Sequence, residues 1–87
     1  MGGSPGPVVF CPAGVKTQVL WSSFLFKTYH ARFSVAGVNI DWERNADLPP
    51  WHTFGKHNTN ATFDAIVAGA YCNFWFTSPV NLTITWE

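Results

Sequence analysis

Residues 80–87, VNLTITWE, alternate apolar and polar side chains without a break, and this period of two constrains the fold more than any other feature. Val80, Leu82, Ile84 and Trp86 share one face, as in a β-strand whose other face meets solvent. No segment carries a helical period of useful length. The alternation therefore predicts an all-β protein.

Further short alternating or apolar segments succeed one another at the spacing of an all-β sandwich or barrel. Residues 31–35 either continue the segment before them or form the next strand. Residues 70–76 are apolar on both faces, which is typical of a central strand. We expect a small antiparallel β-sandwich or jelly-roll-like barrel of six to seven strands. Its segments before residue 80 cover residues 8–11, 15–21, 24–29, 31–35, 38–42, 62–67 and 70–76.

The chain has 87 residues, enough for one domain. Residues 1–7 consist of Gly, Ser and Pro after the Met, and they predict a flexible leader. Residues 3–8 also form two Gly-X-Y triplets, as at the end of a collagen-like stalk, and part of the leader could be a remnant of expression. Residues 8–87 are expected to form a single β-sandwich domain.

The chain contains 8 Phe, 5 Trp and 2 Tyr but only 10 charged residues. Each ring buries about 150–250 Å², which is more surface than one thin core readily hides. We therefore expect some rings to be covered by a second copy of the chain or by a ligand.

The formal net charge is zero and the five basic residues are scattered, so a nucleic-acid partner is not expected. No apolar run approaches the ~18–20 residues of a membrane span. No secretory signal is visible at the start.

Cys11 and Cys72 are the only cysteines. Asn60 and Asn81 each begin an Asn-X-Thr sequon and are predicted to be glycosylated. The sequons favour an extracellular setting, at a cell or virion surface or in secreted form. In that setting Cys11 and Cys72 would form a disulfide, which would stabilise the folded state by roughly 4 kcal/mol. The alternative is two buried free thiols in a reducing compartment.

Residues 44–61 break the alternation with two prolines, a glycine and several Asn and Asp residues, which predicts a long, functional loop. Its rings would stack on the apolar face of a sugar, with Phe54 as a further ring, while its amides and charges bond the hydroxyls. The expected ligand-binding residues are Asp47, Trp51, His52, Lys56, His57, Asn58 and Asn60.

No catalytic, metal or cofactor signature is present, so we expect neither an enzyme nor a cofactor. Asp41 and Glu43 share a face and could suggest paired carboxylates, but they alternate with apolar residues and are expected to be the solvated side of a strand. His52 and His57 lack the further ligands that a zinc site needs.

Residues 63–76, FDAIVAGAYCNFWF, carry a Gly-X-Tyr phrase between two strands. This phrase resembles jelly-roll domains of the tumour-necrosis-factor and complement-globular-head type. The resemblance implies a homotrimer with aromatic residues along the threefold axis, often carried on a collagen-like or fibrous stalk, and it implies no catalytic residues.

These observations favour a non-catalytic, lectin-like module that binds a glycan or a cell-surface receptor, acting as a homo-oligomer with a trimer favoured. One alternative is a structural trimerisation head of a fibrous or collagen-like protein. Another is a small secreted toxin or effector that binds a host protein.

Overall fold

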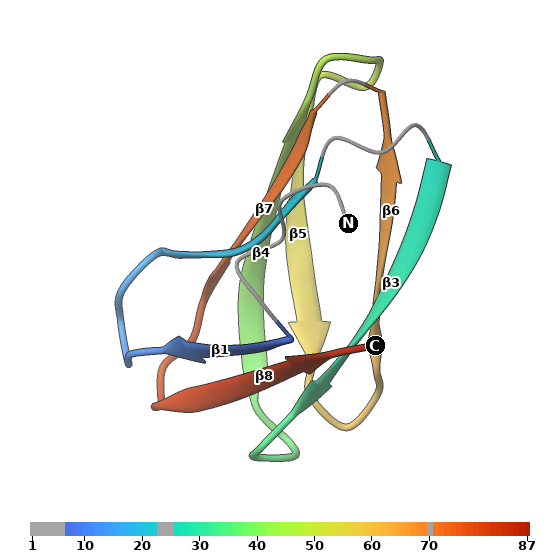
Figure 1. Cartoon of the computed structure of the whole chain (residues 1–87). Helices are drawn as coiled ribbons and strands as arrows, with labels where there is room; N and C mark the ends of the chain where they lie inside the picture. The colour runs from blue at the N-terminus through green and yellow to red at the C-terminus, as the bar shows by residue number, and fades with distance from the viewer. Residues whose placement is uncertain (1–6, 23–25, 70) are drawn as a thin grey trace.

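A computed structural model describes residues 7–22, 26–69 and 71–87, and within these ranges it is built of antiparallel strands. Two four-stranded sheets pack as a sandwich without closing into a barrel (Figure 1). Sheet A has the order β1-β8-β3-β6 and sheet B the order β2-β7-β4-β5. The strands are β1 (Val8–Cys11), β2 (Thr17–Ser22), β3 (Phe26–Phe33), β4 (Asn39–Ala46), β5 (His52–Asn58), β6 (Phe63–Ala68), β7 (Cys72–Thr77) and β8 (Leu82–Trp86).

The pairing follows one rule: β1 pairs with β8, β2 with β7, β3 with β6 and β4 with β5. The chain is therefore arranged as one long hairpin, in which residues 8–46 pair with residues 52–86 and the β4–β5 turn is the tip. This hairpin is bent so that its strands fall into two sheets. Two further pairings, β3 with β8 and β4 with β7, join neighbouring layers of the hairpin into complete sheets.

The core lies between the sheets and consists of the apolar residues that alternate along each strand. On β8, Leu82, Ile84 and Trp86 are buried as the alternation predicts, but Val80, predicted on the same face, precedes the strand and is exposed. β7 is a central strand, but only one of its faces is fully buried. The side chains that form the core are Cys11, Val19, Leu20, Tyr29, Ala31, Ile40, Ala46, Phe63, Ala65, Val67, Cys72, Phe74, Phe76, Leu82, Ile84 and Trp86.

The prediction of six to seven strands is wrong because residues 44–61 are not a loop. β4 continues to Ala46, and His52–Asn58 forms β5, the edge strand of sheet B. Polar residues and Gly55 hide this strand from sequence reasoning, because an edge strand needs few apolar side chains. Only residues 47–51 and 59–62 connect strands here, and they lie at opposite ends of β5 (Figure 1).

The alternation predicted for residues 15–21 is also wrong at its end, because β2 contains a bulge. The register slips between Gln18 and Leu20, so Val19 and Leu20 are both buried and Trp21 turns outward. Trp86 Nε1 of sheet A donates a buried hydrogen bond of 2.8 Å to the carbonyl of Val19 in sheet B. This bond satisfies the carbonyl at the bulge and ties the two sheets together.

The predicted disulfide is not formed: Cys11 and Cys72 are free thiols buried in the core. The Cys11 Sγ lies 3.6 Å from the carbonyl oxygen of Phe76 on β7. Cys72 is four residues before Phe76 on that strand, which places it about 13 Å away along the chain. A disulfide needs Cα atoms within about 7 Å, so this arrangement keeps the thiols apart.

Some predictions fall outside the described residues: most of the leader, residues 1–6, the strand start at Phe24, and Ala70. Pro7 is described, and its carbonyl accepts a hydrogen bond of 2.7 Å from the backbone N–H of Trp86. Gly69, between β6 and β7, has a φ of 93° and approaches Asp47 and Leu48 closely, as expected for a glycine that admits a tight bend.

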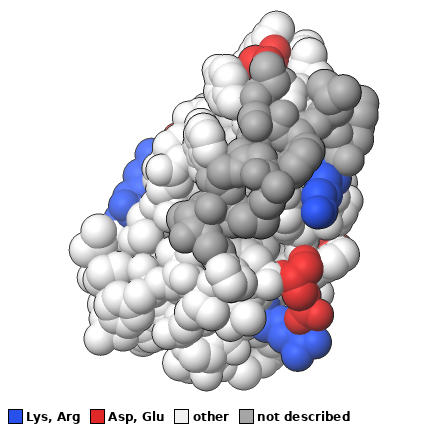
Figure 2. Space-filling model, viewed as in Figure 1, with Lys and Arg blue, Asp and Glu red and all other residues white. Residues whose placement is uncertain are grey.

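The surplus of aromatic surface predicted from composition is present on the described chain. Tyr29, Phe63, Phe74, Phe76 and Trp86 are buried, whereas five rings are exposed. Charged side chains are dispersed over the face seen in Figure 2 and form no patch of one sign. The exposed rings are Phe10, Trp21, Trp51, Phe54 and Tyr71.

Candidate functional site

The outer face of sheet B carries a row of three residues that includes two rings. On β7 the buried Phe74 and Phe76 alternate with Trp75, which therefore faces outward and is half-buried. Trp75 pairs with Glu43 on β4, and Glu43 pairs with Phe54 on β5. These three residues form one row across the sheet. Because neighbouring strands are about 4.8 Å apart, Trp75 and Phe54 lie roughly 10 Å from each other with Glu43 between them.

A groove of about 520 Å³ lies over this row, and we call it the sheet-B groove. Its volume falls within the range of small-ligand sites, and its wall combines rings with a few polar groups. It is lined by Lys16, Asp41, Trp42, Glu43, His52, Phe54, Gly55, Lys56, Trp75 and Thr77.

Glu43 is the centre of the polar network in the sheet-B groove. Lys16 Nζ lies 2.8 Å from Glu43 Oε1, and His52 Nε2 lies 2.8 Å from Glu43 Oε2. The hydrogen bond from Lys16, and then the one from His52, lower the pKa of Glu43 below its ordinary value of 4.5. Glu43 is therefore a carboxylate at neutral pH and offers acceptors only.

The rings of the sheet-B groove are held in place by these charges. Lys16 Nζ lies 5.3 Å from the centre of the Trp75 ring, in a cation–π contact. The rings of His52 and Phe54 are 5.7 Å apart, and 75% of the Phe54 surface is exposed. The Lys16–Glu43–His52 network thus places a carboxylate between the two rings of the groove.

A second ion pair completes the floor beside this row. Lys56 Nζ lies 2.7 Å from Asp41 Oδ1, and Asp41 pairs with Thr77 on β7. Asp41 is exposed and Glu43 partly so, both on the outer face, as the alternation predicts. With two cations and two carboxylates in pairs, the groove has no strong charge of either sign.

Of the ligand-binding residues predicted from the sequence, the sheet-B groove contains His52 and Lys56. Trp51 precedes His52 in the β4–β5 turn, is 62% exposed and does not line the groove. Asp47 lies in the same turn, where its Oδ1 accepts a hydrogen bond of 3.4 Å from the backbone N–H of Tyr71.

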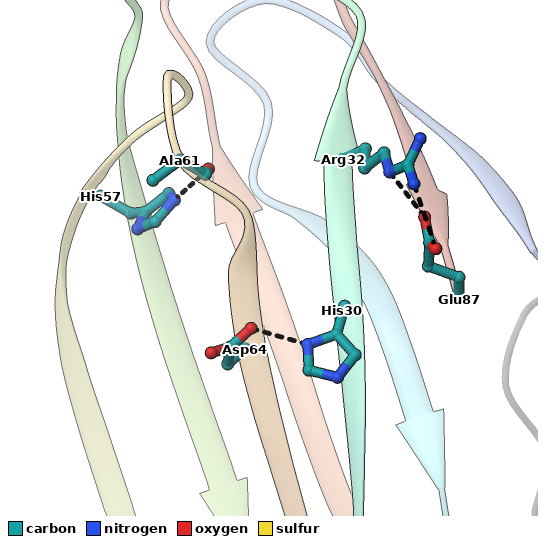
Figure 3. A network of polar contacts seen from close by, with 6 residues as sticks. All are labelled: His30, Arg32, His57, Ala61, Asp64 and Glu87. Carbon is teal, nitrogen blue, oxygen red and sulfur yellow. Dashed lines mark hydrogen bonds and ion pairs between the residues drawn. The ribbon is translucent and has the colours of Figure 1, made fainter.

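The remaining predicted residues lie at the other end of β5. His57 alternates with the outward residues, contacts Phe63 and donates from Nε2 to the carbonyl of Ala61 at 2.9 Å (Figure 3). Asn58 donates to the side chain of Asn39. Asn60 is exposed in the following turn. β5 spans about 20 Å, so the seven predicted residues do not form one site.

Lys16, Glu43 and Trp75 line the groove but are not among the residues that the sequence predicts to bind a ligand. The sequence predicts Trp75 in a strand that is apolar on both faces and Glu43 on the solvated side of a strand. What brings Glu43, Trp75 and Phe54 together is the register of β7, β4 and β5, and this register depends on residues 52–58 forming a strand.

The outer face of sheet A has a different character. His30 Nδ1 lies 2.7 Å from Asp64 Oδ1, and Arg32 Nε lies 2.6 Å from Glu87 Oε2 (Figure 3). These pairs are at least half exposed and stand among threonines. The exposed ring on this sheet is Phe10, on the edge strand β1.

The sequon residues Asn60 and Asn81 are both exposed, and Asn81 Oδ1 accepts a hydrogen bond of 3.0 Å from the backbone N–H of Ala13. In the described ranges, no three His, Cys, Asp or Glu side chains gather where they could hold a metal ion. The same ranges contain no helix long and apolar enough to span a membrane.

Comparison of the chain with protein-family models, with curated proteins and with solved structures found no match.

Proposed function

We propose that the protein is a non-catalytic recognition module that binds carbohydrate through the sheet-B groove. The observation that carries this proposal is the row Trp75–Glu43–Phe54, in which two outward rings flank a carboxylate that is held by Lys16 and His52. A sugar ring has apolar C–H faces and hydroxyl edges, so it matches rings that stack beside fixed acceptors and donors.

Two features narrow the class of ligand. The positive and negative charges of the groove cancel in its ion pairs, which favours a neutral glycan over a strongly charged one. The rings lie about 10 Å apart across the strands, which favours an extended oligosaccharide over a single sugar.

The state of Glu43 supports a binding role over hydrolysis. A glycosidase needs one carboxylic acid whose pKa is raised so that it can protonate the leaving group. The Lys16 and His52 hydrogen bonds move the pKa of Glu43 in the opposite direction. The Asp41 carboxylate is held by Lys56.

The test is a glycan array followed by calorimetry, with the wild type, Phe54→Ala and Trp75→Ala. We expect each substitution to weaken binding at least tenfold, in line with the ~1–3 kcal/mol that a buried aromatic contact contributes at a binding site. Phe10→Ala, which removes an exposed ring from sheet A, is the matched control and should leave binding unchanged. Trp51→Ala tests whether the β4–β5 turn takes part.

The proposal is wrong if the wild type binds no glycan, or if Phe54→Ala and Trp75→Ala bind as well as Phe10→Ala. Loss of binding only in Trp51→Ala would return the site to the turn that the sequence suggested. Binding of a protein in place of any glycan would favour the secreted toxin or effector.

A second candidate function is assembly, as a head that forms a homotrimer. The chain folds into eight strands in two sheets, the strand and sheet numbers of a double-sheet jelly roll. In this proposal the resemblance to tumour-necrosis-factor and complement-globular-head domains extends to assembly. Assembly is favoured by the edge strand β1 of sheet A, on which Val8 and Phe10 are 59% and 56% exposed. Exposed apolar edge strands pair with other chains unless they are covered.

Native mass measurement tests assembly directly. We expect a homo-oligomer for the wild type and a monomer for Phe10→Lys, because a charge on an edge strand opposes pairing. A monomeric wild type at tens of micromolar would rule out the trimerisation head and leave the binding proposal standing. An extracellular location and glycans on Asn60 and Asn81 belong to the same proposal, and the mass of protein from a secreting eukaryotic host checks both sequons.

A further inference from the structure

A second pocket, distinct from the sheet-B groove, opens between the two sheets beside the edge strands β5 and β6. Its volume is about 300 Å³, and it is lined by Trp42, Arg44, Pro50, Phe63, Asp64, Ile66 and Phe74. Phe63 contacts Trp42 and Phe74 edge to face, with ring centres 5.6 and 5.8 Å apart. We call this the inter-sheet pocket.

Arg44 is the unusual residue of the inter-sheet pocket. On β4 it alternates with the outward Glu43 and Asn45, and it shares its parity with the buried Ile40 and Ala46. It also pairs across the sheet with Phe74, a core residue. Arg44 is therefore an inward-facing, half-buried cation at the rim of an apolar core.

The guanidinium of Arg44 is not matched by an acid of the described chain. Lys16, Arg32 and Lys56 each lie within ion-pair distance of a carboxylate. For Arg44 the described polar contact is one hydrogen bond of 3.1 Å from Nη1 to the carbonyl of Pro50. Guanidinium has five N–H donors in a fixed fork, so most of them have no described protein acceptor.

One acid lines the same pocket but faces elsewhere. Asp64 alternates with the buried Phe63 and Ala65, so its side chain stands on the outer face of sheet A. There its Oδ1 is 2.7 Å from His30 Nδ1 (Figure 3). No ion pair joins Asp64 to Arg44, so within the described chain the charge of the guanidinium is available to an external anion.

We propose that the inter-sheet pocket binds a carboxylate attached to an apolar group, with Arg44 as the anion-binding residue. Half-burial raises the strength of an ion pair, and the flat fork of arginine fits both oxygens of a carboxylate. The rings of Trp42, Phe63 and Phe74 receive the apolar part. A volume of about 300 Å³ is at the small end of ligand sites, which suits an acid the size of phenylacetate.

The test uses phenylacetate as the probe and phenylacetamide as the uncharged control, with binding followed by amide NMR shifts. We expect phenylacetate to shift residues of β4, β6 and β7 that line the inter-sheet pocket. Phenylacetamide should bind at least tenfold more weakly, because it offers the fork no negative charge.

Arg44→Gln is the informative variant, since its amide still donates to the Pro50 carbonyl while the charge is lost. We expect at least a tenfold loss of affinity for phenylacetate with little change in affinity for phenylacetamide. Arg32→Gln, at an exposed arginine of sheet A, is the matched control and should bind as the wild type does. Urea unfolding of both variants separates a loss of binding from a loss of fold.

Two peptides that end in Phe, one with a free C-terminal carboxylate and one amidated, distinguish the sources of the acid. Preference for the free-acid peptide over phenylacetate assigns the pocket to a chain end, and the reverse assigns it to a small molecule. The proposal is overturned by equal binding of acid and amide, by an unchanged affinity in Arg44→Gln, by absence of binding, or by shifts confined to the sheet-B groove. Trp42 lines both sites, so the glycan test relies on Phe54 and Trp75, which do not line the inter-sheet pocket.

Discussion

The outer faces of sheets A and B both consist of four antiparallel strands, yet they present different chemistry to solvent. Sheet A shows threonines, the ion pairs His30–Asp64 and Arg32–Glu87, and the exposed apolar side chains of Val8, Phe10 and Ile66, which lie on its two edge strands. Sheet B shows the rings of Phe54 and Trp75 around the Glu43 network.

The fold does not require the rings on the outer face of sheet B. The two central strands of sheet A, β8 and β3, show that this architecture tolerates an outer face of threonines and short ion pairs. Single exposed apolar residues are ordinary, but rings gathered over one groove mark a surface that another molecule covers. Sheet A is therefore the natural internal control for every measurement on sheet B.

The largest effect on stability is expected at the connection that carries the chain from sheet A to sheet B. Gly69→Ala should lower the free energy of unfolding by roughly 3 kcal/mol, because φ is 93° and a Cβ would collide with Asp47 and Leu48. Gly14→Ala is the control, since its φ is 74° but a Cβ there meets open space. It should lose only the backbone term, about 1–2 kcal/mol. Equal losses in urea unfolding would show that the collision is absent.

A smaller loss of stability is expected from removing the buried hydrogen bond that joins the two sheets. Trp86→Phe should lower the free energy of unfolding by about 2 kcal/mol, because the Val19 carbonyl at the β2 bulge loses its donor. Trp75→Phe shortens an indole on the outer face of sheet B and should change stability by less than about 0.5 kcal/mol. Denaturant midpoints that fall equally in both variants would contradict the role of this bond.

The smallest effect is expected from removing a charged partner of Glu43 on the outer face of sheet B. Lys16→Ala removes the strongest hydrogen bond to Glu43, so the pKa of Glu43 should rise toward 4.5. With the pKa lowered in the folded state, the stability that this carboxylate contributes is present above pH 4.5 and is lost as pH falls through the folded pKa. The variant should therefore lose less stability than the wild type on acidification across this window.

NMR titration of the Glu43 carboxyl group checks this expectation. Arg32→Ala, which breaks the ion pair with Glu87 on sheet A, is the control and should leave the Glu43 titration where it is in the wild type. A Glu43 pKa that moves no more in Lys16→Ala than in Arg32→Ala would remove Lys16 from the network.

What the sequence determined by itself is local: which segments are extended and which residues of a strand share a face. Leu82, Ile84 and Trp86 are buried together because side chains alternate along a strand whatever that strand pairs with. Composition likewise determined that rings would remain outside the core, since the number of rings does not depend on topology.

Only the tertiary structure decided the relations between segments. The bulge that turns Trp21 outward, the separation of Cys11 from Cys72, and the row Trp75–Glu43–Phe54 all depend on pairing register, which joins residues far apart in the chain. The edge strand β5 has polar and glycine positions because a sheet edge needs little burial, so its sequence resembles a loop. The residues of the candidate site are therefore brought together by strand pairing, and the local alternation of side chains does not encode which strands pair.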